Sequence, residues 1–354
     1  MNPYNLARSF LNLFDPETAH RIAIKFLQTN LTGSNSAADD PILTQTLWGL
    51  KFLNPIGLAA GFDKDAEVPD AMLRHGFGFV ETGTVTPLPQ LGNPRPRLFR
   101  LEADEAAINR LGFNSGGLDP YAERLATRKG RGGIVGANIG KNKETARAED
   151  DYITGIERVA PLANYVVVNI SSPNTEGLRD LQARQNLETL LKASLKARDK
   201  HLTKAVKIPP LLVKVAPDLS KDEVRDIAEV SLKTGIDGII IGNTTLDRPV
   251  SLLSPDKTET GGLSGKPLME KSTWCLSEFW RLTEGKLPLV GCGGVSSGDD
   301  AYAKIKAGAS LVQLYTALVF QGPQLPARIA RELTALLKRD GFRNVADAVA
   351  TDLR

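Results

Sequence analysis

Cysteine and histidine are scarce in this chain, and the chemistry that depends on them is not expected. The 354 residues include only two cysteines, Cys275 and Cys292, and three histidines, His20, His75 and His201. Two cysteines cannot build a disulfide framework, and none of these residues shows the paired spacing of a zinc site. We therefore expect no metal site and a reducing, cytoplasmic-type compartment.

Charge of one sign and long apolar runs are lacking as well. The net charge is only +3, and no basic block or basic patch with interleaved aromatic residues occurs, so nucleic acid is not expected as a partner. No run of about 18 apolar residues is available to cross a membrane, and the N-terminus has neither signal-peptide nor transit-peptide character. With 42% hydrophobic and 24% charged residues, the composition is that of a globular chain.

Two short amphipathic helices are predicted in the first 30 residues. Asp15 and Pro16 would cap and open the second of them, because Asp is a preferred N-cap residue and Pro suits the first helical turn. The apolar residues at helical spacing are Tyr4, Ala7, Phe10, Leu11 and Phe14 in the first helix and Ala19, Ile22, Ala23, Phe26 and Leu27 in the second. These faces either dock on the body of the protein or lie in a membrane interface.

Apolar runs of strand length alternate with helical segments along the rest of the chain. The runs cover residues 57–60, 78–81, 133–139, 165–170, 211–215, 238–241, 287–291 and 310–315, and helical character is clearest at 66–74, 150–160, 187–198, 222–233, 299–307 and 326–337. Eight strands alternating with helices predict a (β/α)8 TIM barrel. An open doubly wound sheet is the alternative, but it would usually carry a Gly-x-Gly-x-x-Gly turn after its first strand.

The same pattern divides the chain into two parts. We assign residues 1–40, with their polar stretch at 33–40, to the helical extension, and residues 41–354 to the barrel. A hairpin around Trp48 and Gly49 is predicted before the first barrel strand.

Polar residues stand where the predicted strands end, which is where a barrel carries its chemistry. The strand ends bring together Asp63 and Lys64, Thr82 and Thr84, Asn138, Asn169, Lys214, Asn243 and Thr244, Gly293 and Gly294, and Tyr315 and Thr316. The most informative end is Asn-Ile-Ser-Ser-Pro-Asn-Thr at 169–175, where Pro173 fixes the backbone just after Ser172. An ordinary turn uses the same residue types, so the motif indicates a functional site only because it stands at the end of a predicted barrel strand.

Glycine-rich backbone after the seventh strand indicates a phosphate site. Gly293 and Gly294 are followed by Ser296, Ser297 and Gly298 at the predicted start of a helix. Amide donors and the helix dipole bind anions at such places, and the loops after strands seven and eight are the usual phosphate site of these barrels. We therefore expect a phosphate-bearing cofactor.

A lysine inside an apolar strand needs an anionic or electron-rich partner, and Lys214 is such a residue. Lys64, on the opposite side of the barrel mouth, could simply reach solvent. A flat heterocycle with imide edges would suit the five asparagines of this face, which are Asn109, Asn138, Asn169, Asn174 and Asn243. A lysine that forms a Schiff base with a sugar phosphate or pyridoxal phosphate is the alternative, but no acid–base carboxylate or tyrosine stands obviously beside it.

Several long motifs, in one order, resemble a known family over essentially the whole chain. They are Ala-Ala-Gly-Phe-Asp-Lys at 59–64, Glu-Thr-Gly-Thr-Val-Thr-Pro at 81–87, Asn-Pro-Arg-Pro-Arg at 93–97, Asn-Arg-Leu-Gly-Phe-Asn at 109–114, the motif at 169–175, Asn-Thr-Thr-Leu-Asp-Arg at 243–248 and Gly-Gly-Leu-Ser-Gly at 261–265. The chain resembles the class 2, quinone-dependent dihydroorotate dehydrogenases, which are flavin enzymes of pyrimidine synthesis.

The resemblance implies one FMN across the barrel mouth and (S)-dihydroorotate, oxidised to orotate, beside it. The implied FMN residues are Ala60, Gly61, Phe62, Asp63, Lys64, Thr84, Asn138, Asn169, Lys214, Gly242, Gly265, Gly294, Tyr315 and Thr316. The implied substrate residues are Lys64, Asn109, Arg110, Leu111, Gly112, Phe113, Asn169, Asn174, Asn243 and Thr244. One departure is visible, because Gly242 stands where related enzymes carry threonine, and one hydroxyl near the flavin is thereby lost.

Ser172 is the base of this family, and class 1 members carry a cysteine there, so the serine itself favours class 2. Because an unassisted serine is a weak base, it would pass its proton on through water or a neighbouring hydroxyl such as Thr175. Lys64 would neutralise the substrate carboxylate, and Lys214 would stabilise the reduced flavin anion. Residues 176–185 would form a lid that excludes water.

The N-terminal helices fit the same resemblance, which implies docking on the cytoplasmic face of the bacterial inner membrane and access for ubiquinone. His20, Arg100 and Tyr315 fall where the family places its quinone-site polar groups. The lack of Cys-rich iron–sulfur spacing favours a monomer without an electron-transfer subunit. The alternatives are a barrel enzyme of the same superfamily with fumarate or NAD as acceptor, or with another dihydropyrimidine substrate, and a membrane-attached module without chemistry, for which the flavin and base residues would have to be missing.

Overall fold

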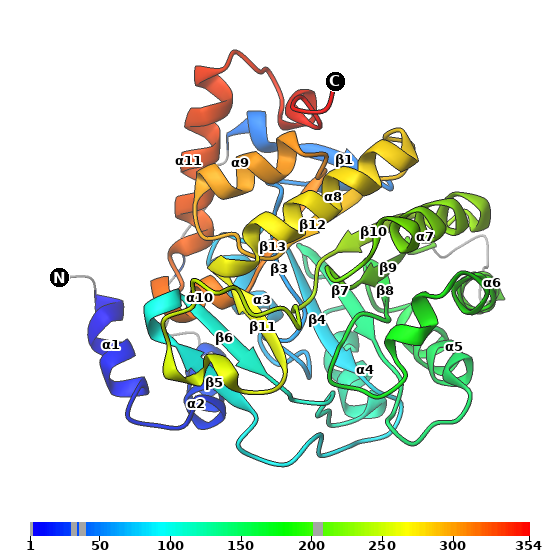
Figure 1. Cartoon of the computed structure of the whole chain (residues 1–354), viewed down its shortest axis with the longest axis horizontal. Coiled ribbons are helices and arrows are strands. Elements are labelled where there is room, and N and C mark those ends of the chain that lie inside the picture. The colour runs from blue at the N-terminus through cyan, green and yellow to red at the C-terminus, as the bar shows by residue number, and fades with distance from the viewer. Residues whose placement is uncertain (1–2, 30–33, 35–39, 201–207) are drawn as a thin grey trace.

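Eight parallel strands close into a barrel in the computed structural model, which describes residues 3–29, 34, 40–200 and 208–354. Around the barrel the order is β3-β4-β7-β8-β9-β10-β12-β13, each strand beside its neighbour in the chain (Figure 1). The bounds are β3 Ile56–Leu58, β4 Phe79–Val85, β7 Ile134–Ile139, β8 Tyr165–Asn169, β9 Leu211–Val215, β10 Gly238–Ile241, β12 Leu289–Cys292 and β13 Leu311–Leu314. The predicted (β/α)8 barrel is confirmed.

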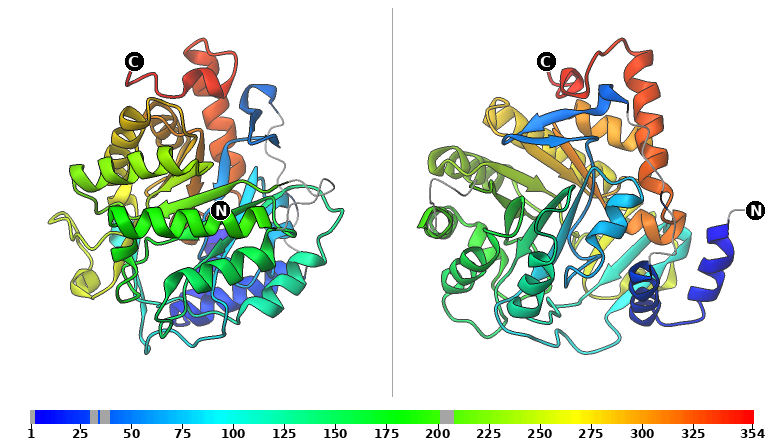
Figure 2. Two further views of the ribbon diagram at one scale, coloured as in Figure 1. Left: turned by 90° about the vertical axis from the view of Figure 1, so that its right-hand side faces the viewer. Right: turned by 180° about the vertical axis from the view of Figure 1, so that it is seen from behind.

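Helices surround the strands on the outside, as both views of Figure 2 show. They are α3 Pro69–Arg74, α4 Leu118–Ala126, α5 Ala148–Val159, α6 Arg184–Lys200, α7 Lys221–Thr234, α8 Met269–Thr283, α9 Gly298–Lys306, the short α10 Thr316–Gln321 and α11 Leu325–Arg339. The six helices named from the sequence are all present, whereas α4, α8 and α10 were not singled out there. The surrounding helices cover the outer face of the strands, and the strands across the barrel cover the inner face. The Val- and Ile-rich strands are therefore buried on both faces and form the core.

The predicted hairpin is confirmed and closes the N-terminal end of the barrel. Strands β1 Gln45–Leu47 and β2 Leu50–Phe52 are antiparallel, with Trp48 and Gly49 at positive φ in the two-residue turn. The Trp48 indole donates to the backbone oxygen of Asp237 at 2.7 Å. Phe52 stacks edge-on against Phe79 of β4 at 5.4 Å. The floor of the barrel is thus filled by side chains.

A three-stranded antiparallel sheet that the sequence did not reveal lies beside the C-terminal end of the barrel. It consists of β5 Leu98–Leu101, β6 Ala106–Asn109 and β11 Gly262–Gly265. Its strands have four residues each, too few for a clear periodic pattern, and β11 pairs with β6 across half the chain. This sheet carries Arg100, Asn109 and Gly265 to the region of the strand ends.

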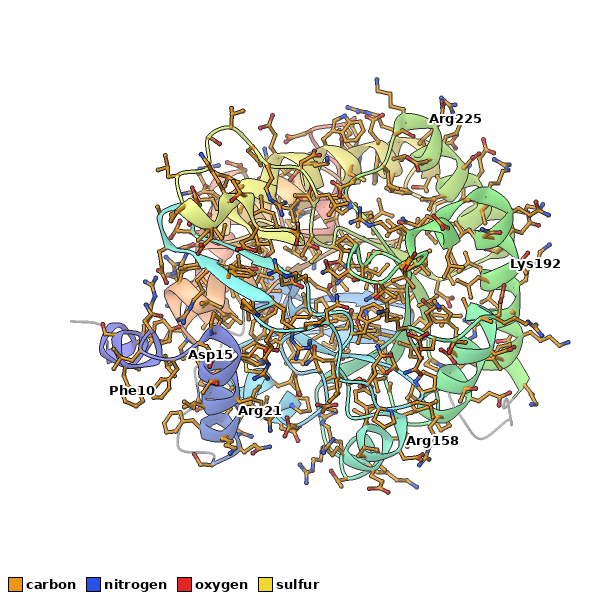
Figure 3. All side chains as sticks on the ribbon, turned by 60° about the horizontal axis from the view of Figure 1, so that its bottom comes forward. Phe10, Asp15, Arg21, Arg158, Lys192 and Arg225 are labelled. Atoms are coloured by element: carbon orange, nitrogen blue, oxygen red, sulfur yellow. The ribbon has the colours of Figure 1, made fainter. Side chains whose placement is uncertain are left out.

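The two N-terminal helices are present as α1 Pro3–Leu11 and α2 Pro16–Gln28. The Asp15 carboxylate accepts from the amides of Glu17 and Thr18, as its N-cap position predicts. Figure 3 shows Phe10 and Asp15 at one edge of the molecule. In the part of the chain that the structure describes, no helix has the length and apolarity needed to cross a membrane. Most of the polar stretch 33–40 lies outside the described residues, and the division at residue 40 stays a prediction.

The N-terminal helices dock on the body of the protein through specific contacts. The hydroxyl of Tyr4 donates to the backbone oxygen of Val319 in α10 at 2.8 Å. The Arg100 guanidinium of β5 donates to the backbone oxygen of Phe14 at 2.7 Å. Three apolar side chains of this extension nevertheless stay in solvent, with exposed fractions of 56% for Phe10, 80% for Leu13 and 55% for Phe26. The extension therefore has one face on the protein and another on which these three side chains remain exposed among the described residues.

Candidate active site

A cavity of about 750 Å³ occupies the C-terminal mouth of the barrel. Its walls come from the strand ends, the sheet of β5, β6 and β11, the start of α10 and the inner faces of α1 and α2. The structure brings most of the expected residues to this lining. They are His20, Ala60, Gly61, Phe62, Lys64, Thr84, Arg100, Asn109, Leu111, Gly112, Phe113, Asn169, Ser172, Asn174, Lys214, Asn243, Thr244, Gly265, Gly294, Tyr315 and Thr316.

Two charged residues expected at the site have side chains engaged elsewhere. The carboxylate of Asp63 accepts the amides of Glu67 and Val68 at 2.7 and 2.8 Å and holds the turn that leads to α3. The guanidinium of Arg110 donates to Glu259 at 2.7 Å and lies over the ring of Phe99. Neither residue belongs to the cavity lining. Their side chains therefore shape the loops behind the site and do not face it.

Gly242 and Asn138 also lie outside the lining. Gly242 has a φ of 112°, and a Cβ at this position would stand 2.1 Å from the backbone oxygen of Cys292. This backbone leaves no room for any side chain, so the local conformation requires glycine at this position. Asn138 is fully buried one layer below the cavity, where its amide bonds to Glu81 and Thr84.

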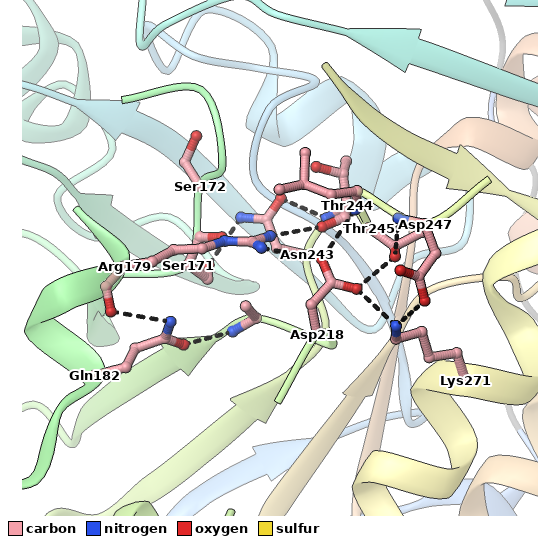
Figure 4. Close-up of polar contacts among 12 residues, drawn as sticks. Ser171, Ser172, Arg179, Gln182, Asp218, Asn243, Thr244, Thr245, Asp247 and Lys271 are labelled. Carbon is pink, nitrogen blue, oxygen red and sulfur yellow. Dashed lines mark hydrogen bonds and ion pairs between the residues drawn. The ribbon is translucent and has the colours of Figure 1, made fainter. Parts of the chain in front are cut away.

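The Ser172 loop is held by a partly buried arginine of the predicted lid segment, Arg179 (Figure 4). Arg179 donates to the backbone oxygens of Ser171 at 3.1 Å and Thr244 at 3.0 Å, and to the carboxylate of Asp218 at 3.0 Å. Gln182 accepts the amide of Ala216 at 2.8 Å. One guanidinium thus ties together the ends of β8, β9 and β10. In this structure the segment is anchored to the barrel.

The carboxylate of Asp218 connects Arg179 to the loop after β10 and to α8. It accepts from the Thr245 hydroxyl, the Leu246 amide, Arg179 and, at 2.9 Å, Lys271 of α8. Burial acts to raise the pKa of this carboxyl, but the hydrogen bonds lower it overall. Asp218 therefore remains ionised and holds the loop after β10 against the lid segment.

Ser172 is nearly buried, and its Oγ accepts the amide N–H of Asn174 at 3.3 Å. This bond orients the hydroxyl lone pairs and leaves the side chain in the cavity wall. The Thr175 hydroxyl is buried and has no hydrogen-bond partner in the described ranges. It is therefore free to exchange a proton with a nearby hydroxyl or water.

Three polar groups on the cavity wall have hydrogen-bonding capacity that the protein does not use and that a ligand could satisfy. The Lys214 ammonium is nearly buried and has no hydrogen-bond or ion-pair partner among the residues that the structure describes. The Thr244 hydroxyl is likewise without a partner there. Lys64 donates to Asn114, and burial lowers the pKa of Lys64 to about 8. Buried polar groups are normally satisfied, so this wall fits an electron-rich, anionic ligand.

In the glycine-rich loop where the sequence predicts a phosphate site, some backbone amides are occupied by side chains and another is not. The amides of Ser296 and Gly298 are already bound to Asp300 at 2.9 Å and to Glu332 at 2.7 Å, so these two amides are not available to a ligand. No acceptor in the described ranges takes the amide of Gly294, which lines the cavity. Of the residues in the predicted phosphate loop, Gly294 therefore keeps an available donor, whereas Ser296 and Gly298 do not.

The outer end of the cavity is largely apolar. His20 of α2 bonds through Nε2 to the backbone oxygen of Phe62 at 2.8 Å, and Phe62 stands edge-on to Tyr315 at 5.6 Å. Burial lowers the pKa of His20 to about 4, so the imidazole is neutral at pH 7. The apolar residues that α1 and α2 contribute to the lining include Phe10, Ala19, Ile22, Ala23, Phe26 and Leu27, whereas Arg8 of α1 is polar. This end suits a hydrophobic, ring-bearing molecule.

Comparisons with known proteins agree with one another. A family model described as dihydroorotate dehydrogenase matches residues 42–337. The chain is 57% identical over its whole length, and the whole length of the relative, to a dihydroorotate dehydrogenase (quinone) of Azorhizobium caulinodans. It is 51% identical to the mitochondrial enzyme of Mus musculus, with 97% of this chain and 88% of that one covered. The crystal structure of DHODH from Eimeria tenella in complex with ferulenol superposes with a TM-score of 0.92 at 46% identity, covering 96% of each chain.

Proposed function

This chain belongs to the dihydroorotate dehydrogenase family, and on that premise we propose how its cavity is divided among cofactor, substrate and electron acceptor. The protein is a flavin-dependent oxidoreductase. It oxidises dihydroorotate to orotate with a quinone as acceptor, which is the redox step of pyrimidine biosynthesis. The single observation that carries the division is that one continuous cavity joins Lys64, Ser172 and Lys214 to the apolar groove of α1 and α2.

We propose that the flavin is FMN, one per chain. Its phosphate would meet the free amide of Gly294 and the backbone around Thr316, and its ring would lie by the unpaired ammonium of Lys214. When bound, the flavin supplies the acceptor for the hydride that dihydroorotate loses. Heat release of the cofactor, followed by chromatography, should give FMN at one mole per mole of chain; FAD or riboflavin would contradict the proposal.

The close approach of Gly294 to α8 allows a sharp test of the phosphate loop. Its φ is 82°, and a Cβ there would lie 2.4 Å from the Cα of Met269. We expect Gly294→Ala to cost about 3 kcal/mol of stability through strain and overlap and to weaken FMN binding. Gly235→Ala is the matched control, because Gly235 has φ 75° with nothing within 4 Å. The control should cost only about 1 kcal/mol and keep FMN; equal FMN loss in both would show that the effect is not local. Urea denaturation measures the free energy of unfolding, and flavin titration measures the affinity for FMN.

The substrate would lie between Lys64 and the asparagine cluster. Lys64 offers the cation for the carboxylate of dihydroorotate, and the loop 109–113 together with Asn174, Asn243 and Thr244 offers donors and acceptors for the ring. The orphan hydroxyl of Thr244 supports this placement. Of the loop, Arg110 would contribute backbone only, since its side chain is bound to Glu259.

Ser172 would take the ring proton at Oγ as its own hydroxyl proton passes to water or to Thr175. The near-burial of the serine and its bond from the Asn174 amide support this role. Segment 176–185, anchored by Arg179, would keep bulk water from this exchange.

The lowered pKa of Lys64 predicts a pH effect on substrate capture. Since that pKa is about 8, the ammonium is charged below pH 8 and neutral above it, and carboxylate binding weakens as pH rises through this value. We expect kcat/KM for dihydroorotate to fall above pH about 8 while kcat does not, because kcat/KM reports the free enzyme. Lys64→Arg keeps its charge at all these pH values and should lose the alkaline fall. A fall that persists in this variant would exclude Lys64 as its cause.

The groove between α1 and α2 would admit ubiquinone, with His20, Arg100 and Tyr315 as its polar groups. Of these, Arg100 also holds α1 through Asn12 and Phe14. The exposed Phe10, Leu13 and Phe26 support docking of residues 1–40 on the cytoplasmic face of the inner membrane. We expect the chain to work as a monomer, and flotation with anionic vesicles, compared with Leu13→Ser, tests the attachment.

A further inference from the structure

A lysine is fully buried behind the glycine-rich loop that follows β12. Lys304 of α9 has an exposed fraction of 0%. Its stem lies against the outer face of β12, where a Cβ at Gly291 would stand 3.1 Å from the Cδ of Lys304. The ammonium donates to the hydroxyl of Ser272 at 2.8 Å and to that of Thr273 at 3.0 Å, both in α8. Lysine is almost never fully buried unless it is paired, so this charge calls for a partner.

The chain supplies no anion for Lys304 in the ranges that the structure describes. The two groups that accept from its ammonium are uncharged hydroxyls. The carboxylate of Asp300 acts on Lys304 only through space, and it is itself bound by the amide and the hydroxyl of Ser296. Burial lowers the pKa of Lys304 to about 8, so the ammonium form still prevails at pH 7. Since an unpaired buried charge is unfavourable, the arrangement fits an anion that arrives with a ligand.

The hydroxyl of Ser272 connects this charge to the glycine-rich loop. Because an ammonium can only donate, Ser272 accepts from Lys304 and has its own proton left to give. It donates to the backbone oxygen of Gly293 at 3.0 Å and, less closely, to that of Met269 at 3.2 Å. The oxygen of Met269 already accepts from Thr273 at 2.7 Å, which favours Gly293 as the acceptor for Ser272.

The peptide between Gly293 and Gly294 leads from this hydroxyl to the cavity. It is a trans peptide, so the N–H of Gly294 points away from the backbone oxygen of Gly293. That oxygen faces Ser272, which is outside the cavity lining, whereas both glycines belong to the lining. The amide of Gly294 is therefore turned toward the cavity, where no acceptor in the described part of the chain takes it.

Resting on the proposed FMN site, we propose that Lys304 is a positioning residue that supplies the buried positive charge behind the cofactor phosphate, acting through Ser272 and the Gly293–Gly294 peptide. A cation that donates into a chain of hydrogen bonds strengthens the donors along it. The N–H at the end of this chain is the one that would meet the phosphate. The chain would therefore favour a flavin that carries a phosphate over one that lacks it.

Lys304→Met tests this role, because it removes the charge and nearly keeps the side-chain volume. The flavin-free full-length protein is titrated with FMN and with riboflavin, which has the same ring system and no phosphate, and the change in flavin fluorescence gives both dissociation constants. We expect the dissociation constant for FMN to rise about tenfold and that for riboflavin to change by less than about twofold. Lys306→Met is the matched control, since Lys306 lies on the same helix but pairs with Asp352 at the surface, and it should change neither constant.

Two hydroxyl variants of α8 test the path, and they keep the proposal testable if Lys304→Met does not fold. Ser272→Ala and Thr273→Val each remove one acceptor of Lys304, but only Ser272 reaches Gly293. Ser272→Ala should therefore weaken FMN binding about three- to tenfold and leave riboflavin binding unchanged. Thr273→Val should change the dissociation constant of either flavin by less than about twofold.

Equal weakening of FMN and riboflavin binding in Lys304→Met would overturn the proposal, because it would mean that Lys304 only supports the fold. Equal weakening of FMN binding in Ser272→Ala and Thr273→Val would also overturn it, since the path would then not run through Gly293. A wild-type protein that binds FMN no more tightly than riboflavin would instead overturn the phosphate site of the proposed function.

Discussion

Ser172→Ala is expected to keep its flavin but to slow flavin reduction by dihydroorotate by about 10²- to 10⁴-fold, the usual contribution of a general base. The reason is local, because the hydroxyl stands in the cavity wall with its lone pairs oriented by the Asn174 amide. Alanine leaves the Arg179 clamp intact, since that clamp uses the backbone oxygen of Ser171. Anaerobic stopped-flow absorbance at the oxidised-flavin band measures the rate.

Two further variants separate the chemistry of Ser172 from a general serine effect. Ser231→Ala removes an equally buried hydroxyl in α7, outside the cavity, and should reduce flavin at the wild-type rate. Ser172→Cys restores a proton acceptor whose thiolate fraction grows with pH, so its rate should lie between the other two and rise with pH. Full-rate reduction in Ser172→Ala would remove Ser172 from the role of base.

Removal of residues 1–30 is expected to leave flavin reduction by dihydroorotate within about twofold of the full chain, because Lys64, Ser172 and the asparagines belong to the barrel. Oxidation of the reduced flavin by a soluble ubiquinone should fall by at least about tenfold, since the apolar groove of α1 and α2 is lost. The two half-reactions are followed separately in the stopped-flow instrument. Equal damage to both would mean that the helices only stabilise the barrel.

A pair of point variants on α2 makes the same test without deleting chain. Ile22 lines the cavity, whereas Lys25 on the same helix does not. Ile22→Glu places a charge in the apolar groove, where its burial is unfavourable, and should raise the KM for quinone. Lys25→Glu introduces the same carboxylate outside the groove and should leave that KM unchanged when a short-chain, water-soluble quinone is used. Matching effects would argue against a quinone path between the helices.

The barrel could be predicted because its strands are buried on both faces and therefore read as continuous apolar runs. The sheet of β5, β6 and β11 could not, because strands of four residues leave no period and β6 finds its partner β11 far along the chain. The cap at Asp15 was readable since it depends on adjacent residues alone. Local chemistry and long apolar runs are thus visible in sequence, and distant pairing is not.

The candidate site shows the same limit. The strand ends located Lys214 and Asn169 correctly at the cavity. In the loop predicted to bind phosphate, Asp300 and Glu332 occupy the amides of Ser296 and Gly298, which the sequence did not indicate. Two residues with several hydrogen bonds around the site were not singled out from the sequence: Glu81, which accepts from Asn138, Gln313 and Tyr165, and Arg179. A signal for Glu81 existed, since it is a charged residue inside an apolar strand just as Lys214 is. Nothing in the sequence indicated that Arg179 would join three strand ends.

The most direct test of the account is an anaerobic absorbance titration of the purified protein with dihydroorotate, followed by addition of a soluble ubiquinone. Full bleaching of the oxidised-flavin band at one equivalent of dihydroorotate, and its full return with quinone, is the expected result, because in the proposed arrangement cofactor, substrate and acceptor would share one cavity. A flavin band that dihydroorotate leaves unchanged, or one that bleaches but does not recover with quinone, would contradict the account.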